Sequence, residues 1–214
     1  GTPWAQEFSE RAIRLVREAT VMDMLCPLQI AGDQADTWMR DPSTFTEEDL
    51  AYFRASGIDV LHPTGGGTSG RDAHENIRTY LGEWNGFLAH HADSFLRITE
   101  PRHLEEVNDS GRIGVILGLQ NSDHFTRVDD VEVFYGLGQR ISQLTYNSQN
   151  RIGTGAMEDR DGGVSDFGAD IIGRMNEVGM AVDVSHCGDR TTLDAFEIST
   201  EPVLITHSNA RVIH

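Results

Sequence analysis

Short apolar runs alternate with amphipathic segments along most of the chain. The runs cover residues 20–25, 58–62, 113–119, 141–146, 181–186 and 202–207. A short run of apolar or β-branched residues between helical patterns is typical of a buried strand in a parallel sheet. The segments between the runs, such as 72–91, 166–178 and 188–199, have the spacing of helices. The pattern therefore predicts strands and helices in regular alternation.

The alternation predicts one α/β domain over residues 1–214, because no internal repeat or linker divides the chain. Such a pattern is typical of a doubly wound sheet or of a (β/α)8 barrel of the TIM type. No Gly-x-Gly-x-x-Gly turn follows the first predicted strand, which disfavours a nucleotide-binding doubly wound sheet. A barrel needs eight strands. On this interpretation the chain holds about six βα units, and about two more would follow His214.

His186 and His207 end the last two predicted strands. In α/β barrels and sheets, the carboxyl ends of the strands form the face that carries the chemistry. A strand-helix-strand unit usually places its two parallel strands side by side. We therefore expect these two histidines to be neighbours, close enough to share a metal ion or one substrate group.

The composition narrows the classes of partner. The 214 residues include 34 acidic and 17 basic side chains, for a formal net charge of −17. This balance disfavours nucleic acid and anionic membranes as partners. No apolar run is long enough to span a bilayer. Two cysteines make no disulfide framework, and the chain begins without Met. Localisation stays open, with the cytoplasm as the default and export as the alternative.

Several motifs resemble the membrane dipeptidase (renal dipeptidase, M19) family of the amidohydrolase superfamily. They are Leu-Gly-Leu-Gln-Asn-Ser at 117–122, Leu-Gly-Gln-Arg-Ile-Ser-Gln-Leu-Thr-Tyr-Asn at 137–147, Asp-Val-Ser-His at 183–186 and Thr-His-Ser-Asn-Ala-Arg at 206–211. The resemblance covers most of the chain from about residue 20. It implies a (β/α)8 barrel of the metal-dependent hydrolase type, a binuclear zinc site at the strand ends, and hydrolysis of dipeptides or related amides.

The family's zinc ligands carry over only in part. The resemblance assigns His186 and His207 as metal ligands. The first strand of the family carries a His-x-Asp pair, but Leu25 and Pro27 stand in those places, and Gln120 matches the bridging glutamate. The family's later aspartate and substrate-binding arginine would lie beyond residue 214. These departures resemble a divergent branch of the family.

The site residues that we predict follow from this resemblance and from the strand ends. Gln120 and Tyr146 occupy catalytic positions, the latter in place of the family's substrate-binding histidine. Tyr146 could orient a carbonyl, and Arg211 could bind a substrate carboxylate in a bidentate fork.

One zinc ion is favoured over two, because a neutral amide at position 120 cannot bridge two dications. A catalytic zinc usually takes a third protein ligand. The candidates for that ligand are Cys26 and His62, and also Asp123 and His124 in the loop that follows Gln120.

Three functions remain open at this point. The first is a zinc-dependent hydrolase of dipeptides or small amides. The second is a metal-depleted barrel that binds a small molecule without turnover. The third is a hydrolase that uses Cys26 or Cys187 as a nucleophile beside a histidine, although no local signature supports it. Because six strands leave an open sheet edge, we also expect this span to aggregate or to pair with a second copy as a homodimer.

Overall fold

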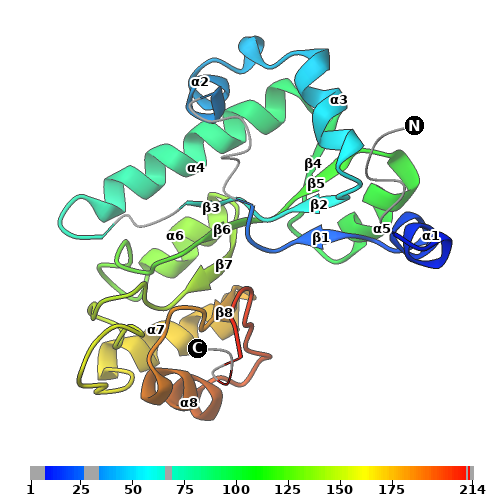
Figure 1. Cartoon of the computed structure of the whole chain (residues 1–214). Coiled ribbons are helices and arrows are strands. Elements are labelled where there is room, and N and C mark those ends of the chain that lie inside the picture. The colour runs from blue at the N-terminus through cyan, green and yellow to red at the C-terminus, as the bar shows by residue number, and fades with distance from the viewer. Residues whose placement is uncertain (1–7, 27–33, 66–68, 211, 213–214) are drawn as a thin grey trace.

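The computed structural model of the chain describes residues 8–26, 34–65, 69–210 and 212. The helices are α1 (Glu10–Glu18), α2 (Gln34–Arg40), the 3-10 helix η3 (Pro42–Thr44), α3 (Glu47–Ala55), α4 (Ala73–His90), α5 (Arg102–Ser110), α6 (Asp130–Gly136), α7 (Asp166–Val178) and α8 (Asp189–Ile198). The strands are β1 (Met22–Asp23), β2 (Val60–Leu61), β3 (Thr64–Gly65), β4 (Phe95–Arg97), β5 (Ile113–Val115), β6 (Leu117–Leu119), β7 (Gln139–Gln143) and β8 (Ala181–Asp183). Figure 1 shows how they are arranged.

Except for β4, the parallel strands lie beside one another in chain order. β2 continues beyond His62 and Pro63 as β3, and β5 continues beyond Ile116 as β6. β1 pairs with β2, β2 and β3 pair with β5 and β6, and β6, β7 and β8 pair in turn. β4 pairs with β5 on the side away from β2, where it forms the edge of the sheet among the described residues. This sequential order is that of a (β/α)8 barrel, whereas a doubly wound sheet reverses its order part way. The prediction of a partial barrel is confirmed.

The sixth predicted strand is shorter than expected. Residues 202–207 contribute one parallel bridge, between Leu204 and Asp183, in place of a regular strand. The Leu204 N–H donates to the carbonyl of Val182, and the Leu204 carbonyl accepts from Val184. Further on, the Thr206 N–H donates to a carboxylate oxygen of Asp183 and not to a ladder carbonyl. The bond to the Asp183 side chain therefore takes the place of a backbone bond, and strand pairing ends before His207.

Local sequence signals account for the ends of two helices. The Thr46 side chain and the Asp49 side chain form a capping box at the start of α3, and Gly179 closes α7 with a left-handed φ of +83°. The polar segment 32–43 contains α2, where Trp38 and Met39 are buried. β3 lies at the start of a glycine-rich segment.

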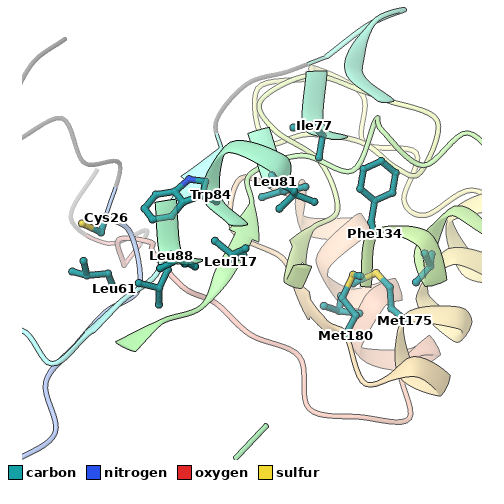
Figure 2. Close-up of a cluster of buried hydrophobic side chains, with 14 of the residues drawn as sticks. Cys26, Leu61, Ile77, Leu81, Trp84, Leu88, Leu117, Phe134, Met175 and Met180 are labelled. Atoms are coloured by element: carbon teal, nitrogen blue, oxygen red, sulfur yellow. The ribbon is translucent and has the colours of Figure 1, made fainter. Parts of the chain in front are cut away.

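One large hydrophobic cluster packs the helices against the outer face of the strands. Figure 2 shows Leu81, Trp84 and Leu88 of α4 beside Leu61 and Leu117. Side chains alternate between the two faces of a strand. Leu117 and Leu119 therefore join this cluster, whereas Gly118 between them faces the opposite side. The same alternation buries Val182 and Val184 in the cluster and turns Asp183 toward the barrel interior.

Several large apolar side chains stay exposed near the two ends of the strand series. They include Leu15 and Val16 on α1, and Leu193, Phe196 and Ile205 in or after α8. Such surface is consistent with the expected aggregation or homodimer, which stays a prediction. Within the described residues, no helix combines the length and the apolar character needed to cross a membrane.

Candidate metal-binding site

His186 and His207 meet where β8 and the segment after α8 end. Their ring centroids lie 4.9 Å apart, with an angle of 63° between the ring planes. His186 sits in a turn with a φ of +59°, a left-handed conformation that residues other than glycine seldom adopt. Strained backbone of this kind persists where the surrounding structure holds it, and it is common at functional sites. The expectation that the two histidines are neighbours is confirmed.

Tyr146 and Asn147 hold the His186 ring from the loop after β7. The Tyr146 ring stacks on the imidazole with centroids 4.3 Å apart and a 28° interplanar angle. Nδ1 of His186 donates to Oδ1 of Asn147 at 2.8 Å. Because Nδ1 carries the proton of the neutral ring, Nε2 keeps its lone pair. Partial burial, and then the electrostatic interaction with His207, lower the pKa of His186, which favours this neutral form.

The His207 ring is fixed through its other nitrogen. Nδ1 lies 2.9 Å from the hydroxyl oxygen of Thr206. Nε2 is buried and has no hydrogen-bond partner among the residues that the structure describes. Buried polar atoms nearly always have a partner. The unpaired nitrogen beside His186 therefore marks a position where a ligand would bind.

Gln120 follows β6 and Tyr146 lies in the loop after the neighbouring strand β7, and the two side chains make different contacts. The Gln120 amide donates to Oγ1 of Thr64 at 2.7 Å, and its backbone carbonyl accepts from the Gln143 amide at 2.8 Å. Its side chain is thus tied to the adjacent strand, while Tyr146 contacts His186 directly. Arg211 and Pro27 lie outside the described residues.

His62 and Cys26, the two candidates for a third ligand, lie in different environments. His62 is buried in the barrel interior, where its Nδ1 donates to the Met24 carbonyl at 2.7 Å. Its Nε2 has no hydrogen-bond partner in the described part of the chain and points at Gly118, where an added Cβ would lie 1.8 Å away. Cys26 instead belongs to the hydrophobic cluster, on the side of Leu61 and Trp84 (Figure 2).

The contacts of Asp123 and His124 are with residues other than His186 and His207. The Asp123 carboxylate accepts from the Gly70 N–H and from the Asn121 amide. His124 is buried against Phe125 and bonds through Nε2 to Gln139. Burial lowers the pKa of His124 to about 3, so its ring is neutral.

The side chains present fit part of a metal site. His186 and His207 supply two adjacent imidazoles, and imidazole nitrogen is a preferred ligand of zinc. Within the described ranges, no three His, Cys, Asp or Glu side chains gather as a metal-binding cluster. The donor chemistry of the pair therefore suits a metal ion, and the structure leaves the third ligand unassigned.

Asn147 and Thr206 contact the two imidazoles but are not among the site residues predicted from the sequence. Each adjoins a predicted site residue, since Asn147 follows Tyr146 and Thr206 precedes His207. A metal-binding histidine almost always donates its second ring N–H to a protein group. A hydrogen-bonding residue next to a candidate ligand is the signal that could have found both.

A cavity of about 440 Å³ opens beside His186. Its walls include Gly155, Glu158 and Asp161 of the loop after β7, together with Ile205 and Ser208. A volume of this order accommodates a small molecule. The cavity would therefore allow a small ligand to reach the imidazole from this side.

Replacing Gly155 by alanine is expected to disturb the His186 ring. An added Cβ would lie 2.4 Å from the backbone carbon of Asn147 and 2.5 Å from the Tyr146 carbonyl oxygen. The loop must shift, which we expect to cost about 1–3 kcal/mol of stability and to weaken metal binding through the displaced Asn147. Denaturant unfolding and zinc titration measure both effects.

A matched control is available on α7. Gly173→Ala adds the same methyl group at a helical position with open space around it. Alanine there should leave zinc affinity unchanged and stability equal or higher. Equal behaviour of the two variants would contradict the close packing of Gly155 against the loop.

Comparison with known proteins places these observations in a family. The family model described as membrane dipeptidase (peptidase family M19) matches residues 10–214. An uncharacterized dipeptidase of Schizosaccharomyces pombe is 35% identical over 109 residues, which are 48% of this chain and 26% of that protein.

Two solved structures share the fold. A crystal structure of an amidohydrolase from Pseudomonas aeruginosa has a TM-score of 0.74 and 28% identity, and the match covers 91% of this chain and 55% of that one. A metallo peptidase from Rhodobacter sphaeroides, liganded with a phosphinate mimic of the dipeptide L-Ala-D-Ala, has a TM-score of 0.76 and 14% identity over 91% and 66% of the two chains. The chain thus spans only part of the length of these relatives. Since the family model covers nearly all of it, the chain belongs to the membrane dipeptidase family, peptidase family M19.

Proposed function

We propose that the protein is a zinc-dependent, dipeptidase-like hydrolase of dipeptides or small amides. The observation that carries this proposal is the His186–His207 pair, in which both rings are held through Nδ1. Membership of a peptidase family that implies a metal cofactor supports it. A structural neighbour that binds a dipeptide mimic supports the substrate class.

The proposed roles follow from the position of each side chain. His186 and His207 would hold the metal ion through Nε2. A bound zinc ion supplies Lewis acidity and lowers the pKa of water. Tyr146, which stacks on His186, would orient the substrate carbonyl. Gln120, whose amide nitrogen is bonded to Thr64, would offer its side-chain oxygen to the same catalytic face. Arg211 would bind the substrate carboxylate.

One ion is favoured over two by the charge of the site. Gln120 is neutral, and its amide is committed to Thr64. Two dications a few ångströms apart repel strongly unless an anionic ligand lies between them. Leu25 has no side chain atom that can bind a metal. We therefore propose one zinc ion per chain, with His62 or Cys26 as the candidate third ligand.

A second candidate function is a small-molecule binding protein that has lost the metal. The observation that favours it is that no group of three ligating side chains forms within the described residues. A hydrolase that uses Cys187 as its nucleophile is disfavoured, because burial raises the pKa of the Cys187 thiol to about 11 and keeps it protonated at neutral pH.

Removal of the metal separates the two candidates. We expect the complete, purified protein to hydrolyse members of a dipeptide panel that includes L-Ala-D-Ala, to lose this activity after dialysis against a chelator, and to regain it with zinc. Dipeptide binding without hydrolysis, with or without zinc, would favour the binding protein. Turnover that a chelator leaves unchanged would contradict the metal-dependent mechanism.

A further inference from the structure

The Thr206 hydroxyl lies between a carboxylate and the His207 ring. Its Oγ1 donates to Oδ2 of Asp183 at 2.6 Å, and Nδ1 of His207 lies 2.9 Å from the same oxygen. A hydroxyl carries a single proton. Because that proton goes to the carboxylate, the Thr206 oxygen can only accept from His207. Nδ1 must therefore carry the ring proton.

Ser185 does not compete for that position. Its hydroxyl lies 2.8 Å from Oδ1 of Asp183 and 3.2 Å from Oγ1 of Thr206. The bond to the carboxylate is both shorter and charge-assisted, so the Ser185 proton also goes to Asp183. The Ser185 oxygen in turn accepts from the backbone N–H of His207 at 3.2 Å. One buried carboxylate thus orders both hydroxyls, as well as the backbone next to the histidine.

Because Nδ1 of His207 carries the ring proton, Nε2 on the other side of the ring is unprotonated. A neutral imidazole has one N–H, so Nε2 of His207 holds a bare lone pair, and this atom is buried without a partner among the described residues. His186 reaches the same tautomer by a different bond, from Nδ1 to Asn147. The two rings therefore present the nitrogen that a metal ion needs.

We propose that Thr206 is a positioning residue that, with Asp183, fixes the tautomer and orientation of His207 for metal binding. The proposal rests on the proposed metal-dependent function. Groups that orient a ligating histidine typically change metal affinity by about 10–100-fold when they are lost. Thr206 contacts the His207 ring at Nδ1, and not at Nε2, the nitrogen proposed to bind the metal.

The first test compares three threonine variants of the complete protein by zinc competition with a chromophoric chelator. Thr206→Val keeps the shape and removes the hydroxyl, and we expect its zinc affinity to fall about 10–100-fold. Thr206→Ser keeps the hydroxyl, so this variant should bind zinc with the wild-type affinity. Thr145→Val is the matched control, because it removes a buried hydroxyl that donates to Cys187 and contacts neither histidine ring.

The second test reads the tautomer directly in metal-free protein, by 15N–1H correlation spectra of the imidazoles. We expect wild-type His207 to show the Nδ1–H form. Asp183→Asn should reverse the proton order: its amide would donate to Thr206, whose hydroxyl would then donate to Nδ1 and leave the proton on Nε2. Zinc affinity should fall with this change.

Two results would overturn the proposal in distinguishable ways. Thr206→Val with wild-type zinc affinity and an unchanged His207 tautomer would show that Thr206 does not position the ring. Wild-type protein that shows the Nδ1–H form but binds no zinc would overturn the proposed function, and with it the metal role given to Thr206.

Discussion

Replacement of both His186 and His207 by alanine is expected to abolish metal binding and dipeptide hydrolysis in the complete protein. The two imidazoles lie next to each other at strand ends, and Nε2 of His207 is buried without a hydrogen-bond partner among the described residues. A catalytic metal ion contributes several kcal/mol of transition-state stabilisation. Its loss should lower kcat/KM by about a thousandfold or more.

The control for this experiment is His90→Ala on the exposed surface of α4. It removes an imidazole that the proposed mechanism does not use, and it should leave kcat/KM and zinc content unchanged. Thermal unfolding of each variant separates a lost site from a lost fold. Undiminished turnover in the folded double variant would contradict the metal role of the pair.

Gly118→Ala is expected to destabilise the barrel by about 3 kcal/mol, the sum of overpacking and one lost hydrogen bond. Its added methyl carbon would lie 1.8 Å from Nε2 of His62. The imidazole must rotate away, which breaks the 2.7 Å bond from His62 Nδ1 to the Met24 carbonyl. Chemical denaturation measures the change in unfolding free energy.

A double-mutant cycle tests the cause of this effect. In a His62→Ala background, the added methyl group meets no imidazole, so Gly118→Ala should cost less than about 1 kcal/mol. Gly82→Ala on α4, where nothing lies within 4 Å of an added Cβ, serves as the control. Additive costs for Gly118→Ala and His62→Ala would show that the two residues are not packed against each other.

The alternation of apolar runs with helical patterns was sufficient to predict a parallel α/β domain, because repeated βα units place parallel strands side by side. The resemblance to the dipeptidase family then favoured a barrel over a doubly wound sheet. The alternation could not predict where each strand stops. The sixth strand is reduced to one bridge at Leu204, because the Thr206 N–H donates to the side chain of Asp183. Asp183 lies 23 positions earlier in the sequence. Such side-chain contacts depend on tertiary structure and leave no local signal.

The candidate metal-binding site could likewise be predicted only in part. His186 and His207 could be predicted from their places at strand ends, and the structure puts the rings in contact. The bonds that set their tautomers involve Asn147, 39 positions before His186, and Asp183, which acts on His207 through Thr206. The burial of Cys26 among apolar side chains is common for a free cysteine, but the side of the strand on which it lies could not be predicted. β1 ends at Asp23, so the alternation of faces no longer holds when the chain reaches Cys26.

The metal content of the complete, purified protein tests the central claim most directly. Elemental analysis by mass spectrometry, after purification with zinc present and removal of loosely held ions, measures the number of ions per chain. The proposed site predicts about one tightly held zinc ion, lost in the His186→Ala/His207→Ala variant. Wild-type protein that holds no metal under these conditions would contradict the metal-dependent mechanism and favour a binding protein on a barrel of this family.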